Sequence, residues 1–206
     1  MITDTNTPER LLLSARRLFA ARGYEGTSVR DLTRAARANL GAVTYHFGSK
    51  ERLYHEVLRR LFQQLVERVT LAVAPPADPV QRLERFVGAM FDQFEENPDM
   101  PRLLVQELSR GRRGLPPPVR EAQGRIRTLL LELVEQGQKD GSILPGPPIL
   151  FALSLLSQPV YFAIVRPILT LVAGIDMDDP DVRAAVVSHA RAFARRGLTA
   201  QPQNQS

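Results

Sequence analysis

The sequence predicts an all-α protein, built from an N-terminal three-helix domain and a larger helical domain. Apolar residues recur at spacings of three and four over long stretches, and strand-like alternation is almost absent. Prolines and glycines fall between these stretches, at positions where helices end. With 206 residues, the chain is long enough for a small domain joined to a larger one with a sizeable core.

The first predicted helix covers residues 8–22. Thr7 is placed to cap it, Pro8 takes the first helical position, and Gly23 follows its end. Its apolar stripe consists of Leu11, Leu12, Ala15, Leu18 and Phe19. This stripe predicts one face of the helix to be buried.

Residues 27–54 predict two short helices joined by a tight turn and followed by a third helix. The hydroxyl of Thr27 or Ser28 is suited to cap a helix over 29–36, because it can accept a backbone N–H that the first turn leaves unbonded. Asn39 is suited to cap a second helix over 40–47, and Gly48 ends it. The arrangement is a helix-turn-helix.

The faces of these two helices indicate what they contact. The wetter side of the first carries Arg30, Asp31, Arg34 and Arg37. The second points Leu40, Gly41, Thr44 and Tyr45 outward. Because Gly41 and Ala42 are small, the helix can approach another surface closely, and a DNA major groove about 12 Å wide just admits a helix.

Further helices are predicted over residues 50–74, 79–96, 101–110, 119–140, 149–173 and 180–196. Pro75 and Pro76 end the long helix that begins at Lys50, because proline lacks an N–H and its ring clashes with the preceding turn. Pro159 and Pro167 predict kinks or breaks within 149–173. Residues 201–206 are predicted to be a disordered tail.

The positive charge of the chain is confined to its N-terminal part. Residues 1–60 hold 11 Lys and Arg against 6 Asp and Glu, whereas residues 61–206 hold 16 of each, for a net charge of +5. Arginine-rich faces are often only solvated surface, but an excess confined to one segment is what binding to a phosphate backbone requires.

Composition argues against an enzyme, a metal site and a bound cofactor. The chain has no cysteine, its three histidines fall on separate helices without metal-binding spacing, and no glycine-rich phosphate loop is present. The polar N-terminus does not resemble a secretory signal, so we expect a cytoplasmic protein. Residues 149–173 are apolar enough for a membrane span, but they contain Arg166 and two prolines and therefore favour a buried helix.

The segment from Glu9 to Leu58 resembles the tetracycline-repressor (TetR) family of bacterial transcription regulators. Its TYHFGSKERLY run is similar to the family signature Tyr-x-His-Phe-x-Ser-Lys-x-x-Leu. Residues at family spacing are Phe19, Gly23, Tyr24, Thr27, Leu32, Gly41, His46, Phe47, Ser49, Lys50 and Leu53. The chain departs from the family at Arg37-Ala38, where Gly-Val is usual, and at Thr44, which is often tyrosine. The TYHFGSK form and the later RLLVQEL segment are similar to the subgroup with a CecR-like C-terminal domain.

The resemblance implies a DNA-binding domain over residues 1–54 and an effector-binding and dimerisation domain over 55–200. We predict that Arg30 contacts a base edge or a phosphate. Groove contact is predicted for Leu40, Gly41, Ala42, Thr44 and Tyr45. Phosphate-contacting or capping roles are predicted for Thr27, Ser28, Asn39, His46 and Lys50.

The last two predicted helices carry more apolar surface than one exposed helix each can present, which favours a homodimer. Two reading helices related by a two-fold axis can then bind a palindromic operator. Predicted interface residues are Leu153, Val160, Ile164, Val182, Val186, His189 and Phe193. An intramolecular core is the alternative for some of them.

The resemblance also implies a small-molecule effector that changes the separation of the two reading heads. Candidate pocket residues are Met90, Phe94, Gln106, Arg110, Gln158, Tyr161 and Phe162. The predicted function is a dimeric repressor released from its operator by a small, largely apolar effector. An effector-independent architectural or adaptor protein that binds DNA is the alternative.

Overall fold

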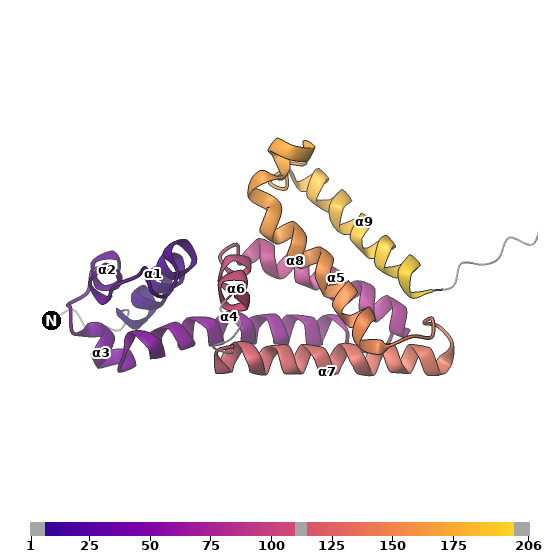
Figure 1. The fold of residues 1–206 in the computed structure, drawn as a ribbon, viewed down its shortest axis with the longest axis horizontal. Helices are drawn as coiled ribbons and strands as arrows, with labels where there is room; N and C mark the ends of the chain where they lie inside the picture. The colour runs from indigo at the N-terminus through magenta and orange to yellow at the C-terminus, as the bar shows by residue number, and fades with distance from the viewer. Residues whose placement is uncertain (1–6, 110–114, 200–206) are drawn as a thin grey trace, which may run out of the picture. The chain divides into compact units, whose positions relative to one another are not determined.

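A computed structural model describes residues 7–109 and 115–199, and within these ranges the regular structure is entirely helical. The helices are α1 (Thr7–Arg22), α2 (Val29–Ala35), α3 (Ala42–Phe47), α4 (Lys50–Ala72), α5 (Pro79–Glu96), α6 (Met100–Ser109), α7 (Pro117–Asp140), α8 (Pro148–Ala173) and α9 (Pro180–Leu198) (Figure 1). The all-α prediction is confirmed. The tail predicted over 201–206 lies outside the described residues.

One predicted helix start and one predicted feature of a helix interior differ in the structure. The helix expected over 40–47 begins only at Ala42, because residues 39–41 form a turn in which the Asn39 carbonyl accepts the Ala42 N–H at 2.9 Å. Kinks or breaks were predicted at Pro159 and Pro167, and the structure excludes the breaks, because α8 stays helical through both prolines.

Contacts divide the chain into two units. Unit 1 comprises Met1–Gln64 and Asn97–Ala122, and unit 2 comprises Leu65–Glu96 and Gln123–Ser206. This grouping differs from a division at residue 54, because α6 contacts α1 and therefore joins the N-terminal helices.

Unit 1 is built around α1, whose apolar stripe is buried as the spacing predicts. Leu11, Ala15 and Phe19 have no exposed area. The Phe19 ring meets the Tyr54 ring edge-on, with centroids 4.8 Å apart. Just before α6, the Asp99 carboxylate accepts from Arg16 Nε at 3.1 Å, and on α6 itself Gln106 Nε2 donates to the Ala20 carbonyl at 3.1 Å.

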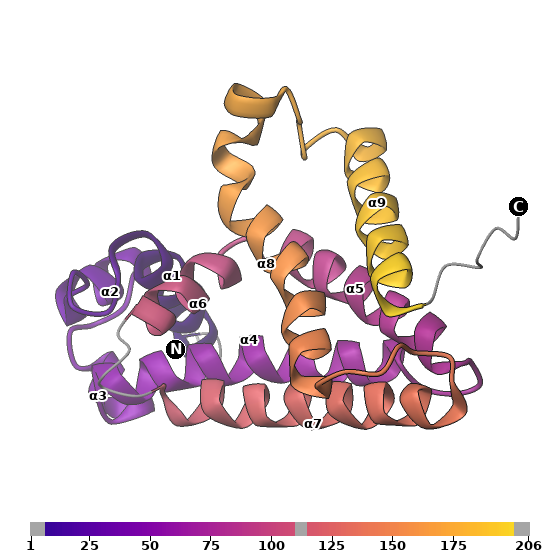
Figure 2. The same ribbon diagram turned by 45° about the vertical axis from the view of Figure 1, so that its right-hand side comes forward.

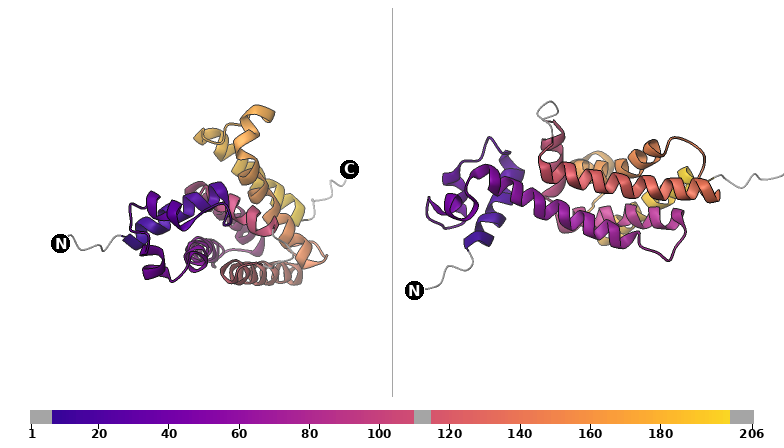
Figure 3. Two further views of the ribbon diagram at one scale, coloured as in Figure 1. Left: turned by 60° about the vertical axis from the view of Figure 1, so that its left-hand side comes forward. Right: turned by 90° about the horizontal axis from the view of Figure 1, so that it is seen from below.

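Unit 2 is organised around α5, which contacts both α8 and α9 (Figure 2). Leu83, Phe86, Val87 and Met90 bury one side of α5. Ion pairs add polar links, since Arg195 binds Glu84 and Arg183 binds Glu95. Figure 3 shows these helices from two further sides.

The apolar helix α8 is not buried within the single chain. It is long and apolar enough to cross a membrane, but only 17% of its most apolar 18-residue window is buried. One such helix is weak evidence for a membrane protein. The expectation of a buried helix is therefore wrong for the isolated chain, and α8 presents an apolar surface.

Candidate nucleic-acid interface and ligand cavity

The start of α2 is fixed by a reciprocal cap. Ser28 Oγ accepts the Asp31 N–H at 3.1 Å, and Asp31 Oδ2 accepts the Ser28 N–H at 3.1 Å. The hydrogen bonds from the Ser28 side chain and backbone lower the pKa of Asp31, and Arg22 and Arg34 add to this effect. Ser28 therefore serves the fold as a capping residue, and its contact with DNA remains a prediction.

The cap predicted at Asn39 is wrong. Gly41 is the N-cap residue of α3, and no side chain caps this helix. Asn39 acts through its main-chain carbonyl, and its side chain is exposed. The first turn of α3 is therefore closed by backbone hydrogen bonds alone.

The outer face of α3 is open and carries large apolar groups. Tyr45 is 84% exposed and Leu40, just before the helix, is 57% exposed. Val43 is 1% exposed and anchors the opposite face. Apart from Gly41 and its two chain neighbours, no atom of the described residues lies within 4 Å of the position that a Cβ on Gly41 would take, so the approach to α3 is open there. Thr44 is also exposed, and Ala42 is half-buried.

Thr27 and Lys50 are occupied within the fold. Thr27 is 1% exposed and its Oγ1 donates to the Gly23 carbonyl at 2.8 Å. Lys50 Nζ donates to the carbonyls of Tyr24 and Thr27 at 2.9 and 3.0 Å, and lies 4.0 Å from the centroid of the Tyr24 ring. These side chains shape the loop between α1 and α2.

Arg30 lies on α2 and His46 on α3. Arg30 is exposed, and no ion pair joins it to another described residue. His46 is half-buried and stacks edge-on against Tyr45, with ring centroids 4.8 Å apart. His46 therefore orients Tyr45.

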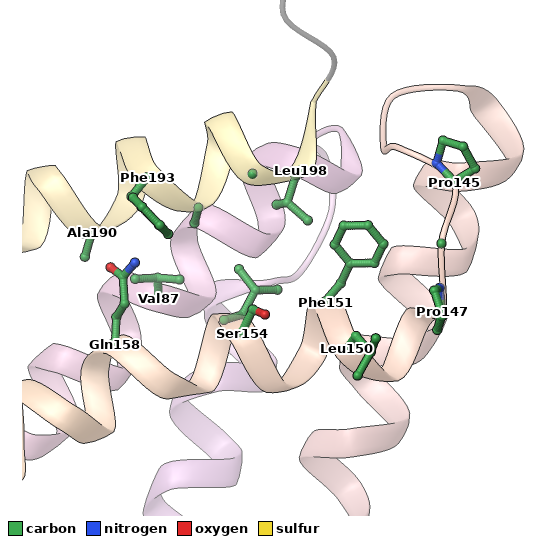
Figure 4. A pocket seen from close by; sticks show the side chains of 14 residues that line it. Val87, Pro145, Pro147, Leu150, Phe151, Ser154, Gln158, Ala190, Phe193 and Leu198 are labelled. Carbon is green, nitrogen blue, oxygen red and sulfur yellow. The ribbon is translucent and has the colours of Figure 1, made fainter.

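A cavity of about 390 Å³ opens in unit 2 between α5, α8, α9 and the loop before α8 (Figure 4). Its wall is mainly apolar and includes Val87, Leu150, Phe151, Phe193 and Leu198. Gln158 contributes the amide seen in Figure 4, and its buried Oε1 has no hydrogen-bond partner among the described residues. A buried acceptor without a partner is costly, so this oxygen suits a donor on a bound molecule.

The predicted pocket residues do not gather at this cavity. Gln158 lines it, whereas Met90 and Phe94 are buried in the unit 2 core. Tyr161 is 61% exposed, Phe162 packs against Phe91 with centroids 6.0 Å apart, and Gln106 belongs to unit 1. Arg110 lies outside the described residues.

The predicted interface residues lie on the surface of α8 and α9. Leu153, Ile164 and Phe193 are 55%, 43% and 59% exposed. His189 is exposed, and the half-buried members are Val160, Val182 and Val186. Exposed apolar residues that the prediction omitted extend this surface: Ile168, at 50%, and Val172, at 67%. Ile168 and Val172 follow Ile164 by four and eight residues, so helical spacing could have placed them on the same face of α8.

Sequence reasoning also missed most of the cavity wall and the conformation of one turn residue. Ser154, Phe151 and Leu198 meet only because α8 and α9 both pack on α5. Arg37 has φ +50°, although arginine has no local preference for that region. No periodicity in the sequence indicates either feature, but the glycine that is usual in the family at the Arg37 position was a signal for positive φ.

The helix α3 has an exposed face and follows the capped helix α2 after a tight turn. This arrangement is that of a helix-turn-helix DNA-binding protein, in which the second helix enters the major groove. Residues 11–57 match the family described as bacterial regulatory proteins, tetR family, and residues 79–193 match the tetracyclin repressor-like C-terminal domain. The chain belongs to the TetR family and is a DNA-binding transcriptional regulator.

Individual proteins are similar to this chain in sequence or in fold. The HTH-type transcriptional repressor NicS of Pseudomonas putida is 25% identical over 195 residues, which cover 93% of this chain and 92% of NicS. The regulator PfmR of Thermus thermophilus has a similar structure, with a TM-score of 0.74 and 27% identity over 97% of this chain and 100% of PfmR. AibR, in a structure with isovaleryl coenzyme A and operator DNA, gives a TM-score of 0.72 at 20% identity over 91% of this chain and 97% of AibR.

Proposed function

We propose that this regulator is a cytoplasmic homodimeric repressor that binds a palindromic operator and is released by a small, largely apolar effector. The exposed α3 face, with Tyr45 84% exposed beside the unobstructed Gly41, is the observation that carries the DNA-reading part. The relative NicS is named a transcriptional repressor, which supports repression as the mode of regulation.

The apolar surface of α8 and α9 supports the homodimer. Large exposed apolar patches on soluble proteins mark interaction sites, because water contact with them is unfavourable. A second copy offers the same surface and can cover it around a two-fold axis. Two α3 helices related by that axis can read the two halves of a palindrome.

The dimer is tested with two leucines of nearly equal exposure. Leu153 on α8 is 55% exposed and Leu13 on α1 is 56% exposed. We expect Leu153→Asp to shift the protein from dimer to monomer in sedimentation velocity, and Leu13→Asp to leave the dimer intact. A dimer that persists in Leu153→Asp with an unchanged dissociation constant would contradict this interface.

The cavity beside Gln158 supports an effector site. Its volume of about 390 Å³ is in the range of small-molecule sites, and its wall is mainly apolar, with Gln158 and Ser154 as polar side chains. The buried Gln158 Oε1 calls for a ligand with one hydrogen-bond donor. Phe193 lines the cavity and also belongs to the proposed dimer surface, so ligand binding can change how two copies pair. AibR, which has the same fold, binds both isovaleryl coenzyme A and operator DNA, which supports a small-molecule site in addition to the DNA-binding site.

The effector site is tested with two serines on α8. Ser154 lines the cavity and Ser157 does not. In a screen of small apolar amides, alcohols and acids, measured as release of operator DNA, Ser154→Leu should weaken the response because the larger side chain takes up part of the cavity, and Ser157→Leu should retain the full response. Equal responses in the two variants would place the effector elsewhere. A wild-type protein that responds to no compound would favour the effector-independent alternative.

A further inference from the structure

Arg37 adopts a left-handed backbone conformation that is unfavourable for a residue with a side chain. Its φ is +50°, and among the residues the structure describes it is the one non-glycine with positive φ. In this region the Cβ atom crowds the backbone, which is why glycine is usual there. Arg37 therefore occupies a position where its side chain carries a conformational cost.

The surrounding hydrogen bonds explain how this conformation persists. After α2, the Arg37 N–H bonds the Arg34 carbonyl at 3.2 Å and the Ala38 N–H bonds the Thr33 carbonyl at 2.9 Å. This is the pattern of a helix end closed by a left-handed residue. Arg10 Nε on α1 also donates to the Ala36 carbonyl at 3.1 Å. The turn is thus fixed from both sides.

The Arg37 side chain makes no polar contact with the described residues that would offset this conformational cost. It is exposed, and no hydrogen bond or ion pair joins its guanidinium to another described residue. A cation near a helix C-terminus is favourable, but Arg34 already lies in the last turn of α2. The positive φ closes the end of α2, but nothing in the described structure accounts for an arginine at this position, which points to a contact of its side chain outside the fold.

We propose that Arg37 is a DNA contact, with its guanidinium bound to a phosphate beside the groove that α3 enters. Arg37 lies three residues before Leu40, so the two Cα atoms are at most about 11 Å apart. Because a groove about 12 Å wide is lined by phosphates, a side chain on the turn before an inserted helix lies within reach of that wall. The planar guanidinium can bind two phosphate oxygens at once. The inference rests on α3 being the groove helix.

The proposal is tested with the full-length protein and two DNA duplexes, one from its own upstream region and one of unrelated sequence. Arg37→Asn keeps a residue that tolerates positive φ but removes the charge, and Arg37→Lys keeps the charge. The control Arg17→Gln removes one exposed charge from α1 of the same unit. Binding is measured over a series of salt concentrations, together with the melting temperature of each variant.

We expect Arg37→Asn to weaken binding to both duplexes by about tenfold at low salt. The slope of log K against log salt should fall by about 0.9, the value for one lost phosphate contact. Arg37→Lys should keep most of the affinity, Arg17→Gln should keep the wild-type slope, and all melting temperatures should stay at or above the wild-type value.

Three results would overturn the proposal. The first is an Arg37→Asn variant that binds both duplexes as the wild type does, with the same slope. The second is loss of binding to the upstream duplex alone with the slope unchanged, which would indicate base reading. The third is a lowered melting temperature that accounts for all the lost binding, which would make Arg37 structural. If the wild type shows no preference for the upstream duplex, the operator assignment fails, and the unrelated duplex still tests Arg37.

Discussion

At the scale of single residues, a buried polar contact of unit 1 joins Tyr54 and Glu107. Tyr54 is 2% exposed and Glu107 is 1% exposed, and the Tyr54 hydroxyl donates to Glu107 Oε1. A buried acceptor that loses its donor costs stability, because water does not replace the lost bond. This contact links α4 to α6 within the unit.

Replacing Tyr54 with phenylalanine should therefore lower the free energy of unfolding by about 1–3 kcal/mol. Urea denaturation followed by circular dichroism measures the change. Tyr45→Phe removes a hydroxyl that is exposed and should leave the unfolding midpoint unchanged. Equal midpoints for the wild type and Tyr54→Phe would show that the bond contributes nothing.

The Ser28–Asp31 cap gives a pH dependence with a defined sign. The folded pKa of Asp31 is lowered by Ser28, so the cap stabilises the protein above the unfolded pKa and is lost as the pH falls through the folded value. We expect Ser28→Ala to raise the pKa of Asp31 in an NMR titration and to reduce the loss of stability on acidification. An Asp31 pKa that is the same in both proteins would contradict the cap.

At the scale of elements, two glycines in α7 lie in opposite surroundings. A Cβ at Gly137 would lie 2.5 Å from Ile143 Cδ1 and 3.1 Å from Ile143 Cβ, and Ile143 is 2% exposed. A Cβ at Gly124 would meet nothing within 4 Å. The same substitution at the two sites therefore separates packing from helix propensity.

Gly124→Ala should raise the free energy of unfolding by about 0.5–1 kcal/mol, because alanine favours a helix. Gly137→Ala should lower it by about 1 kcal/mol net, because overpacking costs about 1–3 kcal/mol and exceeds that gain. Denaturation midpoints of the full chain measure both. A stabilised Gly137→Ala would show that Ile143 moves aside freely.

The elements also show which features local sequence determines. Ser28, Gly23 and Gly48 mark helix ends as predicted, since capping and positive φ are properties of a few neighbouring residues. The Asn39 cap failed because a backbone turn, and not the side chain, begins α3. The positive φ of Arg37 was not predicted, because hydrogen bonds from α1 and α2 hold this turn in a conformation that arginine itself disfavours.

At the scale of the whole molecule, the helix-turn-helix was more predictable than the cavity in unit 2. The outward residues of the helix-turn-helix follow from helical spacing over one short stretch, as Val43 inside and Tyr45 outside show. The cavity instead depends on which faces of α5, α8 and α9 meet, and only Gln158 among the predicted pocket residues lines it. The exposure of α8 was missed for a related reason, because apolar spacing alone does not distinguish a buried core helix from one whose apolar face is exposed in the single chain.

The most direct test of DNA reading by α3 is binding of the purified protein to DNA from its own upstream region, with excess unrelated competitor. The wild type should bind saturably in the presence of competitor, and more weakly as salt rises. Tyr45→Ala should lose about tenfold or more of this specific affinity, whereas Leu71→Ala, also a large exposed side chain at 77%, should lose none. Specific binding that is unchanged in Tyr45→Ala would contradict the assignment of α3 as the reading helix.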